Sequence, residues 1–302
     1  MSSVSFVVPV FNKSLYLKHV VNSILSQKGD FDKEYIFIDD GSTDDSLKIL
    51  KKETRGLKNC KIITQKNKGS ANATNIGINM AKMKYIKFLD ADDIILSNAT
   101  LCLLNLLEKN RGSVLAYGLQ RKVENIKSVD LDEVFDCNDT FIIEKPIFLA
   151  MRNSMFNPSQ FLVRTKVCQM VGGCDERVIH SQEYSLTLRL SRFGNFIKLN
   201  YPIAILPLSA PGQISEKKNN QIFRVSKALE FFLKENKDLS IFYKLYGQRR
   251  LTARSWRFAR RFKKKYFFSR YFFLYLAGLV RLPFFHERIC NIANEVYEDF
   301  LD

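Results

Sequence analysis

The chain has 302 residues, 46% apolar and 13% aromatic, which suffices for one large α/β domain with an appendage. Lysine and arginine outnumber aspartate and glutamate by 47 to 31, and this net charge of +16 predicts a polyanionic partner: nucleic acid, an anionic membrane surface or a nucleotide. No uncharged apolar run reaches bilayer-spanning length, so a transmembrane helix is not expected.

The six cysteines lack the C-x2-C spacing of a zinc module and the density of a disulfide framework. We expect most of them to be small buried apolar side chains in a reducing cytosol. The N-terminal segment Met1–Phe6 has no basic stretch followed by an apolar run, so no signal peptide is expected. These features predict a protein that is made in the cytoplasm and stays there.

The first elements are an apolar strand, an amphipathic helix and a second strand. Residues 4–10 are nearly all apolar, as in a strand buried on both faces, and Pro9 should end it because proline cannot donate to a ladder. Apolar residues at helical spacing follow over 15–25. A second buried strand over 35–38 then runs into Asp39 and Asp40.

The pattern repeats twice more before residue 100. Ser42 and Asp45 have the spacing of a capping box at the start of a helix. A short strand over 61–64 and a helix that includes Ile76, Met80 and Met83 come next. The strand over 85–89 then runs straight into three carboxylates, at Asp90, Asp92 and Asp93.

This alternation predicts an α/β fold with a mostly parallel central sheet flanked by helices. The glycine motifs of dinucleotide folds and P-loops are missing from the sequence. Carboxylates stand instead at the strand ends, where open α/β sheets bind ligands. Asp90 and Asp92 are spaced to face one hard cation, Mg²⁺ or Mn²⁺; alternatively, these aspartates only open a polar loop and cap the next helix.

The ordered segments VSFVVPVFNKSLYL, SILSQ, YIFIDDGSTDDS, NKGSANATNIGINMA and YIKFLDADD resemble the N-terminal half of bacterial family 2 glycosyltransferases. The resemblance implies a Rossmann-like GT-A fold and an inverting enzyme that transfers a sugar from a nucleotide-diphosphate donor. It also implies a nucleotide-sugar-binding half over residues 1–97 and an acceptor-binding half over 98–218. A helical extension is expected over 219–302.

The resemblance places Pro9 and Phe11 at the nucleoside pocket, and Asp39 and Asp40 at the base and ribose. A carboxylate can accept hydrogen bonds from an imide N–H or from ribose hydroxyls. The alternative is that Asp39 and Asp40 only start the following helix.

Gly69 and Asn75 belong to the segment that corresponds to the family's donor-binding Asn-x-Gly…Ala-Arg-Asn. Here Thr74 stands where arginine is usual, and it cannot supply that charge. Asp90, Ala91 and Asp92 match the family's D-x-D. The resemblance implies that Asp90 faces the sugar or ribose, and that Asp92 binds Mn²⁺ or Mg²⁺ against the diphosphate.

Inversion requires a base that deprotonates the acceptor hydroxyl. By resemblance Glu183 takes this position, where aspartate is commoner, and Gln182 replaces the acid that usually precedes it. The alternative is that Glu183 only stabilises a helix N-terminus. His180 is a rival base because its ordinary pKa suits neutral pH.

The segment from Lys244 to Arg288 is strongly basic, contains Glu287 as its single acid, and is interspersed with aromatic residues. Such helices lie in the headgroup region of anionic membranes. Nucleic-acid binding is one alternative. The other is an ordinary helical extension with a solvated basic face or a homo-oligomer contact. We favour peripheral attachment to the inner face of the cell membrane, because it fits a lipid-linked acceptor.

These features predict a metal-dependent inverting glycosyltransferase that uses a nucleotide sugar, UDP by resemblance. Its acceptor is a hydroxyl of a glycan or lipid-linked molecule in surface polysaccharide synthesis. A nucleotidyltransferase is a second hypothesis, but the segment after the first strand lacks the expected phosphate loop. A nucleic-acid-binding protein is a third, but it leaves the aspartate motifs unexplained, so no nucleic-acid partner is expected.

Overall fold

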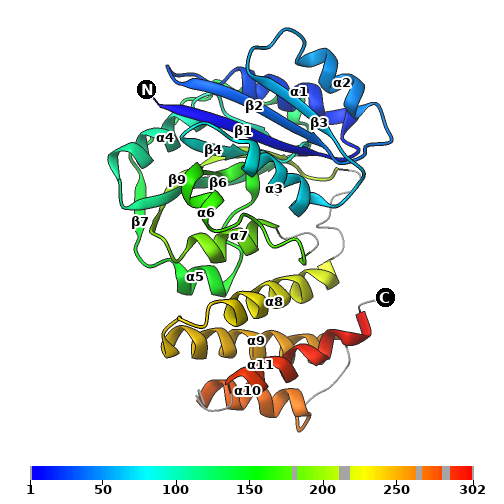
Figure 1. Ribbon diagram of the computed structural model, residues 1–302, viewed down its shortest axis with the longest axis vertical. Coiled ribbons are helices and arrows are strands. Elements are labelled where there is room, and N and C mark those ends of the chain that lie inside the picture. Colours follow the sequence, from blue (N-terminus) through cyan, green and yellow to red (C-terminus); the bar gives the residue numbers. More distant parts are fainter. Residues whose placement is uncertain (1, 179–181, 211–217, 263–266, 281–285, 301–302) are drawn as a thin grey trace.

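The computed structural model describes residues 2–178, 182–210, 218–262, 267–280 and 286–300. An α/β part comes first, and a helical extension is stacked against its α5–α7 side (Figure 1). The first half of the α/β part consists of β1 (Ser3–Val10), α1 (Ser14–Leu25), β2 (Asp32–Asp39), α2 (Ser46–Glu53), β3 (Cys60–Thr64), α3 (Ser70–Met80) and β4 (Tyr85–Phe88).

The second half consists of β5 (Ile94–Ile95), α4 (Ala99–Lys109), β6 (Ser113–Val123), β7 (Thr140–Ile143), α5 (Ile147–Arg152), β8 (Phe161–Arg164), α6 (Thr165–Met170), α7 (Gln182–Leu190) and β9 (Asn195–Pro207). The extension consists of α8 (Lys218–Glu235), α9 (Ile241–Phe262), α10 (Arg270–Val280) and α11 (His286–Asn294). The C-terminal helices predicted from the sequence are therefore present. Among the described residues, no helix is both long and apolar enough to cross a membrane.

The central sheet has the strand order β3-β2-β1-β4-β8-β6-β9-β5, with β7 paired to β9. Strands β1 to β4 are parallel to one another, as their alternation with helices predicted. β8 lies antiparallel between β4 and β6, and β6 runs parallel to β9. Val10 is in register with Asp39, and Val7 with Phe88, so β1, β2 and β4 end at the same edge.

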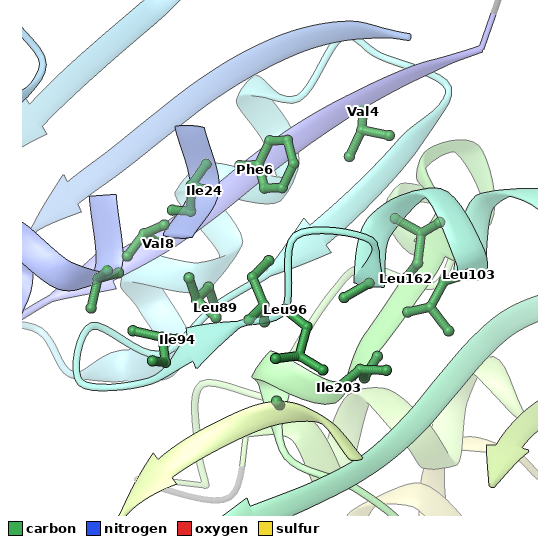
Figure 2. Packing of buried hydrophobic residues seen from close by; sticks show 14 of the residues in the cluster. Val4, Phe6, Val8, Ile24, Leu89, Ile94, Leu96, Leu103, Leu162 and Ile203 are labelled. Carbon is green, nitrogen blue, oxygen red and sulfur yellow. The ribbon is translucent and has the colours of Figure 1, made fainter. Parts of the chain in front are cut away.

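Apolar side chains cover both faces of this sheet. Phe6 and Val8 of β1 point into the core that α1 and α4 cover (Figure 2). Val7 points into the opposite core, under α3, α6 and α7. Gly77 lets α3 approach the sheet closely, because a Cβ there would lie 2.3 Å from Cγ1 of Val7. The close packing fixes the start of α3 beside the edge where the strands end.

The helical extension shares an apolar core with the α/β part. Ile147 of α5 and Tyr184 of α7 pack with Leu229 of α8 and Leu251 of α9. A further cluster around Trp256 holds the rest of the extension together. Burial on this scale makes the extension a packed part of the same body, because each fully buried large side chain contributes about 2 kcal/mol.

The predicted capping box of Ser42 and Asp45 is wrong. α2 begins at Ser46, and its first-turn amide donates to Oδ1 of Asp44 at 2.9 Å. The Ser42 hydroxyl instead accepts a hydrogen bond from the backbone N–H of Asn12 at 3.1 Å. Asp44 takes the capping role because its short side chain lies two residues before the Ser46 amide.

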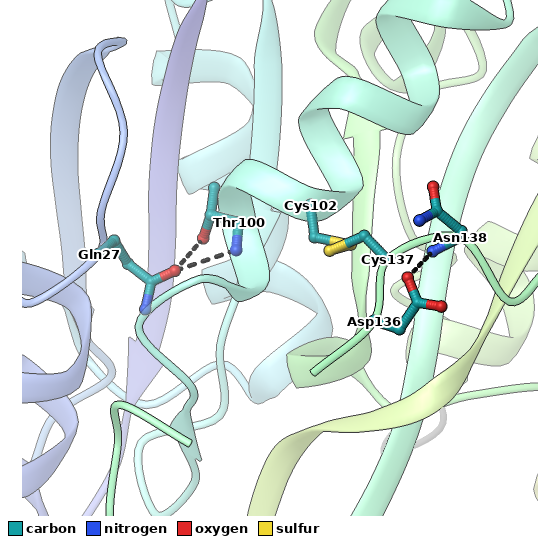
Figure 3. Close-up of a disulfide and its surroundings, with 6 residues drawn as sticks. All are labelled: Gln27, Thr100, Cys102, Asp136, Cys137 and Asn138. Carbon is teal, nitrogen blue, oxygen red and sulfur yellow. Dashed lines mark hydrogen bonds between the residues drawn. A yellow bond between two sulfur atoms is a disulfide. The ribbon is translucent and has the colours of Figure 1, made fainter. Parts of the chain in front are cut away.

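One disulfide, Cys102–Cys137, joins α4 to the segment before β7, with 5.9 Å between the Cα atoms (Figure 3). This bond was not expected from the sequence, because the two cysteines are separated by 35 residues and meet only through tertiary folding. Cys168 and Cys174 are buried free thiols, as expected, and Cys290 is buried as well. Burial raises the pKa of Cys290 to about 12, which keeps this thiol protonated.

Candidate active site

The site candidates gather where β1, β2 and β4 end. Because these strands are parallel and adjacent, the residues that follow them lie along one edge of the sheet. The loop after β1 contributes Lys13, the end of β2 contributes Asp39 and Asp40, and the loop after β4 contributes Asp90 and Asp92. The structure thus brings together groups that are far apart in the sequence.

Asp92 is paired with Lys13, a residue not expected at the site from the sequence. Nζ of Lys13 lies 2.7 Å from Oδ2 of Asp92, and the two side chains are only 15% and 12% exposed. The sequence signal was the position of Lys13, three residues after a strand that neighbours β4 in a parallel sheet. Lys13 therefore supplies positive charge at the place where the D-x-D motif would hold a cation.

A buried polar cluster lies behind Asp92. Asp93 accepts a hydrogen bond from Oγ of Ser159 at 2.6 Å, and the same hydroxyl oxygen accepts from the backbone N–H of Asp90 at 3.0 Å. Nζ of Lys87 is fully buried and donates to the carbonyl oxygens of Phe88 and Ser159. These bonds connect β4 to the turn before β8 and fix the loop that carries Asp90 and Asp92.

Burial dominates the electrostatics of this cluster. It raises the pKa of Asp90 to about 7, with the neighbouring carboxylates of Asp92 and Glu183 adding to the effect. It also raises the pKa of Asp93 well above its usual range. Burial lowers the pKa of Lys87 to about 7, against the attraction of Asp93 and Asp90. The lysine therefore compensates only part of the negative charge of the carboxylates after β4, and a bound cation would lower the free energy of these carboxylates.

Asp39 and Asp40 are both buried, but they differ in hydrogen bonding. Asp40 accepts bonds from the backbone N–H groups of Lys68 and Gly69 at 2.8 and 2.9 Å, and from Nε2 of Gln65 at 2.6 Å. It therefore holds the loop before α3. Oδ1 of Asp39 is buried and has no hydrogen-bond partner among the described residues. An orphaned carboxylate oxygen is costly unless a ligand donates to it.

Of the residues expected at the donor site, Phe11 is exposed, Pro9 is half-buried and Ala91 is buried. Phe11 is 45% exposed just after β1, and Pro9 is half-buried within β1, which continues to Val10. Ala91 is buried in the core that α1 covers, so its side chain packs inward. Thr74, at the position of the family's arginine, is also buried.

Gly69 and Asn75 shape α3 and its contacts. Gly69 has φ +90 at the position preceding α3, a backbone conformation that favours glycine. Nδ2 of Asn75 donates to the carbonyl oxygen of Cys174 and to Oε1 of Glu176, and its Oδ1 accepts from the N–H of Cys174. Asn75 thus joins the first half of the chain to the turn before α7.

Glu183 lies in the first turn of α7, which packs against α3 and α6 across the sheet face. Its Oε1 accepts a hydrogen bond from Oγ of Ser154 at 3.3 Å, and its charge acts on Asp90. Burial raises the pKa of Glu183 above the usual glutamate value. Gln182 accepts from Oγ of Ser70 at 3.0 Å, so the start of α7 is also held by α3. His180 lies outside the described residues.

The fit of a metal ion rests on the chemistry of these carboxylates. Within the described ranges, no group of three or more histidine, cysteine, aspartate or glutamate side chains is placed to hold a metal. Asp90 and Asp92 nevertheless fit Mg²⁺ or Mn²⁺, because such cations in nucleotide sites take one or two carboxylates and complete their shell with phosphates and water. Lys13 would have to release Asp92 to such an ion.

Comparison with known proteins identifies the family. The family model described as Glycosyl transferase family 2 matches residues 5–168. The chain is 27% identical over 197 residues to the chondroitin synthase of Escherichia coli, covering 65% of this chain and 28% of that protein. It is 32% identical over 157 residues to the poly(ribitol-phosphate) beta-N-acetylglucosaminyltransferase TarP of Staphylococcus aureus (strain N315), covering 50% of this chain and 47% of TarP.

Both curated relatives are longer than this chain's matched region, and the chain spans less than half of either. The crystal structure of S. aureus TarS 1–349 in complex with UDP-GlcNAc has a TM-score of 0.67 and 16% identity to this chain. The match covers 99% of this chain and 91% of the TarS chain, and it shows that the fold is shared. Since the family model also covers more than half of the chain, the protein belongs to glycosyl transferase family 2 and has the GT-A fold.

Proposed function

We propose that this protein is a metal-dependent inverting glycosyltransferase that moves a sugar from a nucleotide-diphosphate donor to a hydroxyl of a glycan or lipid-linked acceptor. The observation that carries the proposal is the meeting of Asp90, Asp92 and Glu183 at the edge where β1, β2 and β4 end. The proposal places the enzyme in the synthesis of a cell-surface polysaccharide. Membership of family 2 favours it over a nucleotidyltransferase or a nucleic-acid-binding protein.

The donor would lie along the strand ends. The orphaned Oδ1 of Asp39 would accept a hydrogen bond from the base or ribose. Asp92, with Asp90 beside it, would hold Mn²⁺ or Mg²⁺, which when bound would stabilise the charge of the departing diphosphate. UDP is the nucleotide we propose, supported by the UDP-GlcNAc complex of the TarS structure. Lys13 would then be free to approach the diphosphate.

Glu183 would act as the base. It would accept the proton of the acceptor hydroxyl as this oxygen attacks the anomeric carbon, on the face opposite the diphosphate. Its raised pKa makes it a stronger base than an ordinary glutamate, and Ser154 orients its Oε1. The bond between sugar and diphosphate breaks as the new glycosidic bond forms, so the configuration inverts.

Two variants test these roles. With a panel of UDP-sugars and Mn²⁺, the wild type should release UDP, and EDTA should stop this release. Asp92→Asn should lose the metal-dependent turnover, whereas Glu183→Gln should retain UDP binding in calorimetry and lose transfer by about a hundredfold or more. Turnover that persists in EDTA would refute the metal role, and near-normal kcat in Glu183→Gln would remove Glu183 as base.

We also propose that the extension attaches the enzyme to the inner face of the cell membrane. Several large apolar side chains around α10 are exposed, and Phe268 is the most exposed at 85%. Phe267, Phe273, Leu279 and Val280 are also exposed, and arginines of α9 would meet anionic headgroups. In a density-gradient flotation assay, the wild type should rise with vesicles that contain phosphatidylglycerol. A Phe268→Ser/Phe273→Ser variant should remain at the bottom of the gradient. Equal flotation of both proteins, or flotation with neutral vesicles alone, would refute this attachment, and light scattering would show whether the surface joins two copies instead.

A further inference from the structure

A cavity lies beside the carboxylate proposed as the base. Its volume is about 240 Å³, and it is lined by Tyr117, Leu149, Arg152, Asn153, Ser154 and Met155. The Ser154 hydroxyl connects it to Glu183, to which it donates at 3.3 Å. Whatever occupies this cavity therefore lies next to the atom proposed to take the acceptor's proton.

Two arginines of α9, in the helical extension, reach the end of α5 beside this cavity. Arg254 is buried and donates to the carbonyl oxygens of Met151 and Arg152 and to the hydroxyl of Tyr184. Arg250 donates from Nη2 to the carbonyl oxygen of Arg152 at 2.8 Å. Its Nε is buried and has no hydrogen-bond partner among the residues that the structure describes.

The guanidinium groups of Arg250 and Arg254 form a positive cluster at the end of α5, and the exposed Arg152 lines the cavity there. In the described part of the chain, no carboxylate lies within ion-pair distance of Arg152, Arg250 or Arg254. Burial, with Arg254 and Arg257 close by, lowers the pKa of Arg250 below its ordinary range. Uncompensated buried charge is unfavourable, and an anion bound to this cluster would remove the penalty.

We propose that this cavity is an acceptor subsite for an oxyanion, a phosphate or a carboxylate carried by the acceptor near its reacting hydroxyl. Arg152 would contact the oxyanion, and Arg250 would supply the second guanidinium, in the forked geometry that suits such groups. Arg254 would act as a positioning residue, because it ties the end of α5 to Tyr184, the neighbour of Glu183 on α7. This inference rests on the proposed function and specifies its substrate class: an acidic glycan.

The test measures acceptor binding by the full chain with three oligosaccharides of similar size. One carries phosphodiesters, one carries uronic acids and one is neutral. We expect at least one acidic oligomer to bind about tenfold or more tightly than the neutral one, since each guanidinium–oxyanion contact is worth about a factor of ten. The preferred oligomer identifies phosphate or carboxylate as the source. Equal affinity for all three, or no binding, would overturn the inference.

Variants locate the preference in the cavity. Arg152→Gln and Arg250→Gln should each weaken binding of the acidic oligomer about tenfold, and Arg250→Lys should restore part of it. Arg249→Gln, which removes an exposed charge from the same helix, is the matched control and should leave binding unchanged. If the Gln variants bind the acidic oligomer as tightly as the wild type does, the cavity is not the subsite.

A donor-side measurement separates this inference from the proposed function. Hydrolysis of the UDP-sugar without acceptor reports the donor half alone, and the Arg152 and Arg250 variants should retain it. Absence of hydrolysis and of UDP binding in the wild type would defeat the proposed function. Normal hydrolysis with no loss of acidic-acceptor affinity in the variants would defeat only the subsite.

Discussion

Asn75 offers a test of whether a residue expected at the donor site acts on the donor or on the fold. Its side chain makes three hydrogen bonds to the turn before α7: Nδ2 to Cys174 O at 3.0 Å, Nδ2 to Glu176 Oε1 at 2.7 Å, and Cys174 N–H to Oδ1 at 2.8 Å. Gly173 packs so closely that a Cβ there would lie 2.4 Å from Oδ1 of Asn75. The geometry indicates that Asn75 holds the two halves of the site together.

The expected cost of Asn75→Ala follows from these bonds. The two partly buried bonds with Cys174 contribute about 1 kcal/mol each. The exposed bond to Glu176 contributes about 0.5 kcal/mol, because solvent screens it. The total loss is about 2.5 kcal/mol. With an unfolding entropy of about 0.6 kcal/mol/K for 302 residues, Tm should fall by about 4 °C.

Urea denaturation and thermal unfolding measure this loss, and calorimetry at low temperature measures UDP affinity of the folded variant. We expect reduced stability with UDP affinity within about twofold of the wild type. Asn79→Ala is the matched control on α3, where the side chain is exposed, and it should change stability by less than about 0.5 kcal/mol. Unchanged stability together with a large loss of UDP affinity would refute this reasoning and would show that Asn75 acts on the donor.

Two further predictions concern charge at the site. Burial raises the pKa of Glu183, so the base form is lost as pH falls through a value above the usual pKa of glutamate, about 4.3. The acid limb of the kcat–pH profile should therefore lie above that value. An acid limb at or below it would contradict the assignment of Glu183 as the base. Lys13→Met should free Asp92 from a partly buried ion pair worth about 1 to 2 kcal/mol, and it should therefore tighten Mn²⁺ binding about tenfold. The electron paramagnetic resonance signal of free Mn²⁺ measures this affinity. Lys18→Met, an exposed change on α1, is the control, and equal Mn²⁺ affinity in the two variants would show that Lys13 does not compete for Asp92.

The parallel half of the fold was predictable because its information is local. Runs such as residues 4–10 and 85–88 are mostly apolar, with Ser5 and Lys87 as the exceptions, and helices separate the strands at regular spacing. Parallel pairing then requires their ends to share an edge, which brings Asp39 near the aspartates after β4. The resemblance added the expected role of Glu183, which no local pattern supplies.

The contacts that were missed join segments that are distant in sequence. Lys13 meets Asp92 across 79 residues, and Cys102 meets Cys137 through a segment without regular spacing. Such pairings depend on how loops and helices pack after the strands are placed, and single-sequence periodicity carries no information about them. Asn75 illustrates a related limit, since a motif identifies a position but not which of its neighbours the side chain will contact.

The contact between α9 and the end of α5 means that the extension cannot be removed as a separate module. A chain that ended at residue 243 would lose Leu251 from the shared core and Arg254 from its bonds to Met151 and Tyr184. It would expose apolar surface on α5 and α7 and loosen the helix that presents Glu183. Truncation would therefore abolish activity by destabilising the acceptor side, and a loss of membrane binding in the same chain would be uninterpretable. The extension is therefore part of the folded body that carries the site, and membrane attachment has to be tested with single substitutions around α10 instead of a truncation.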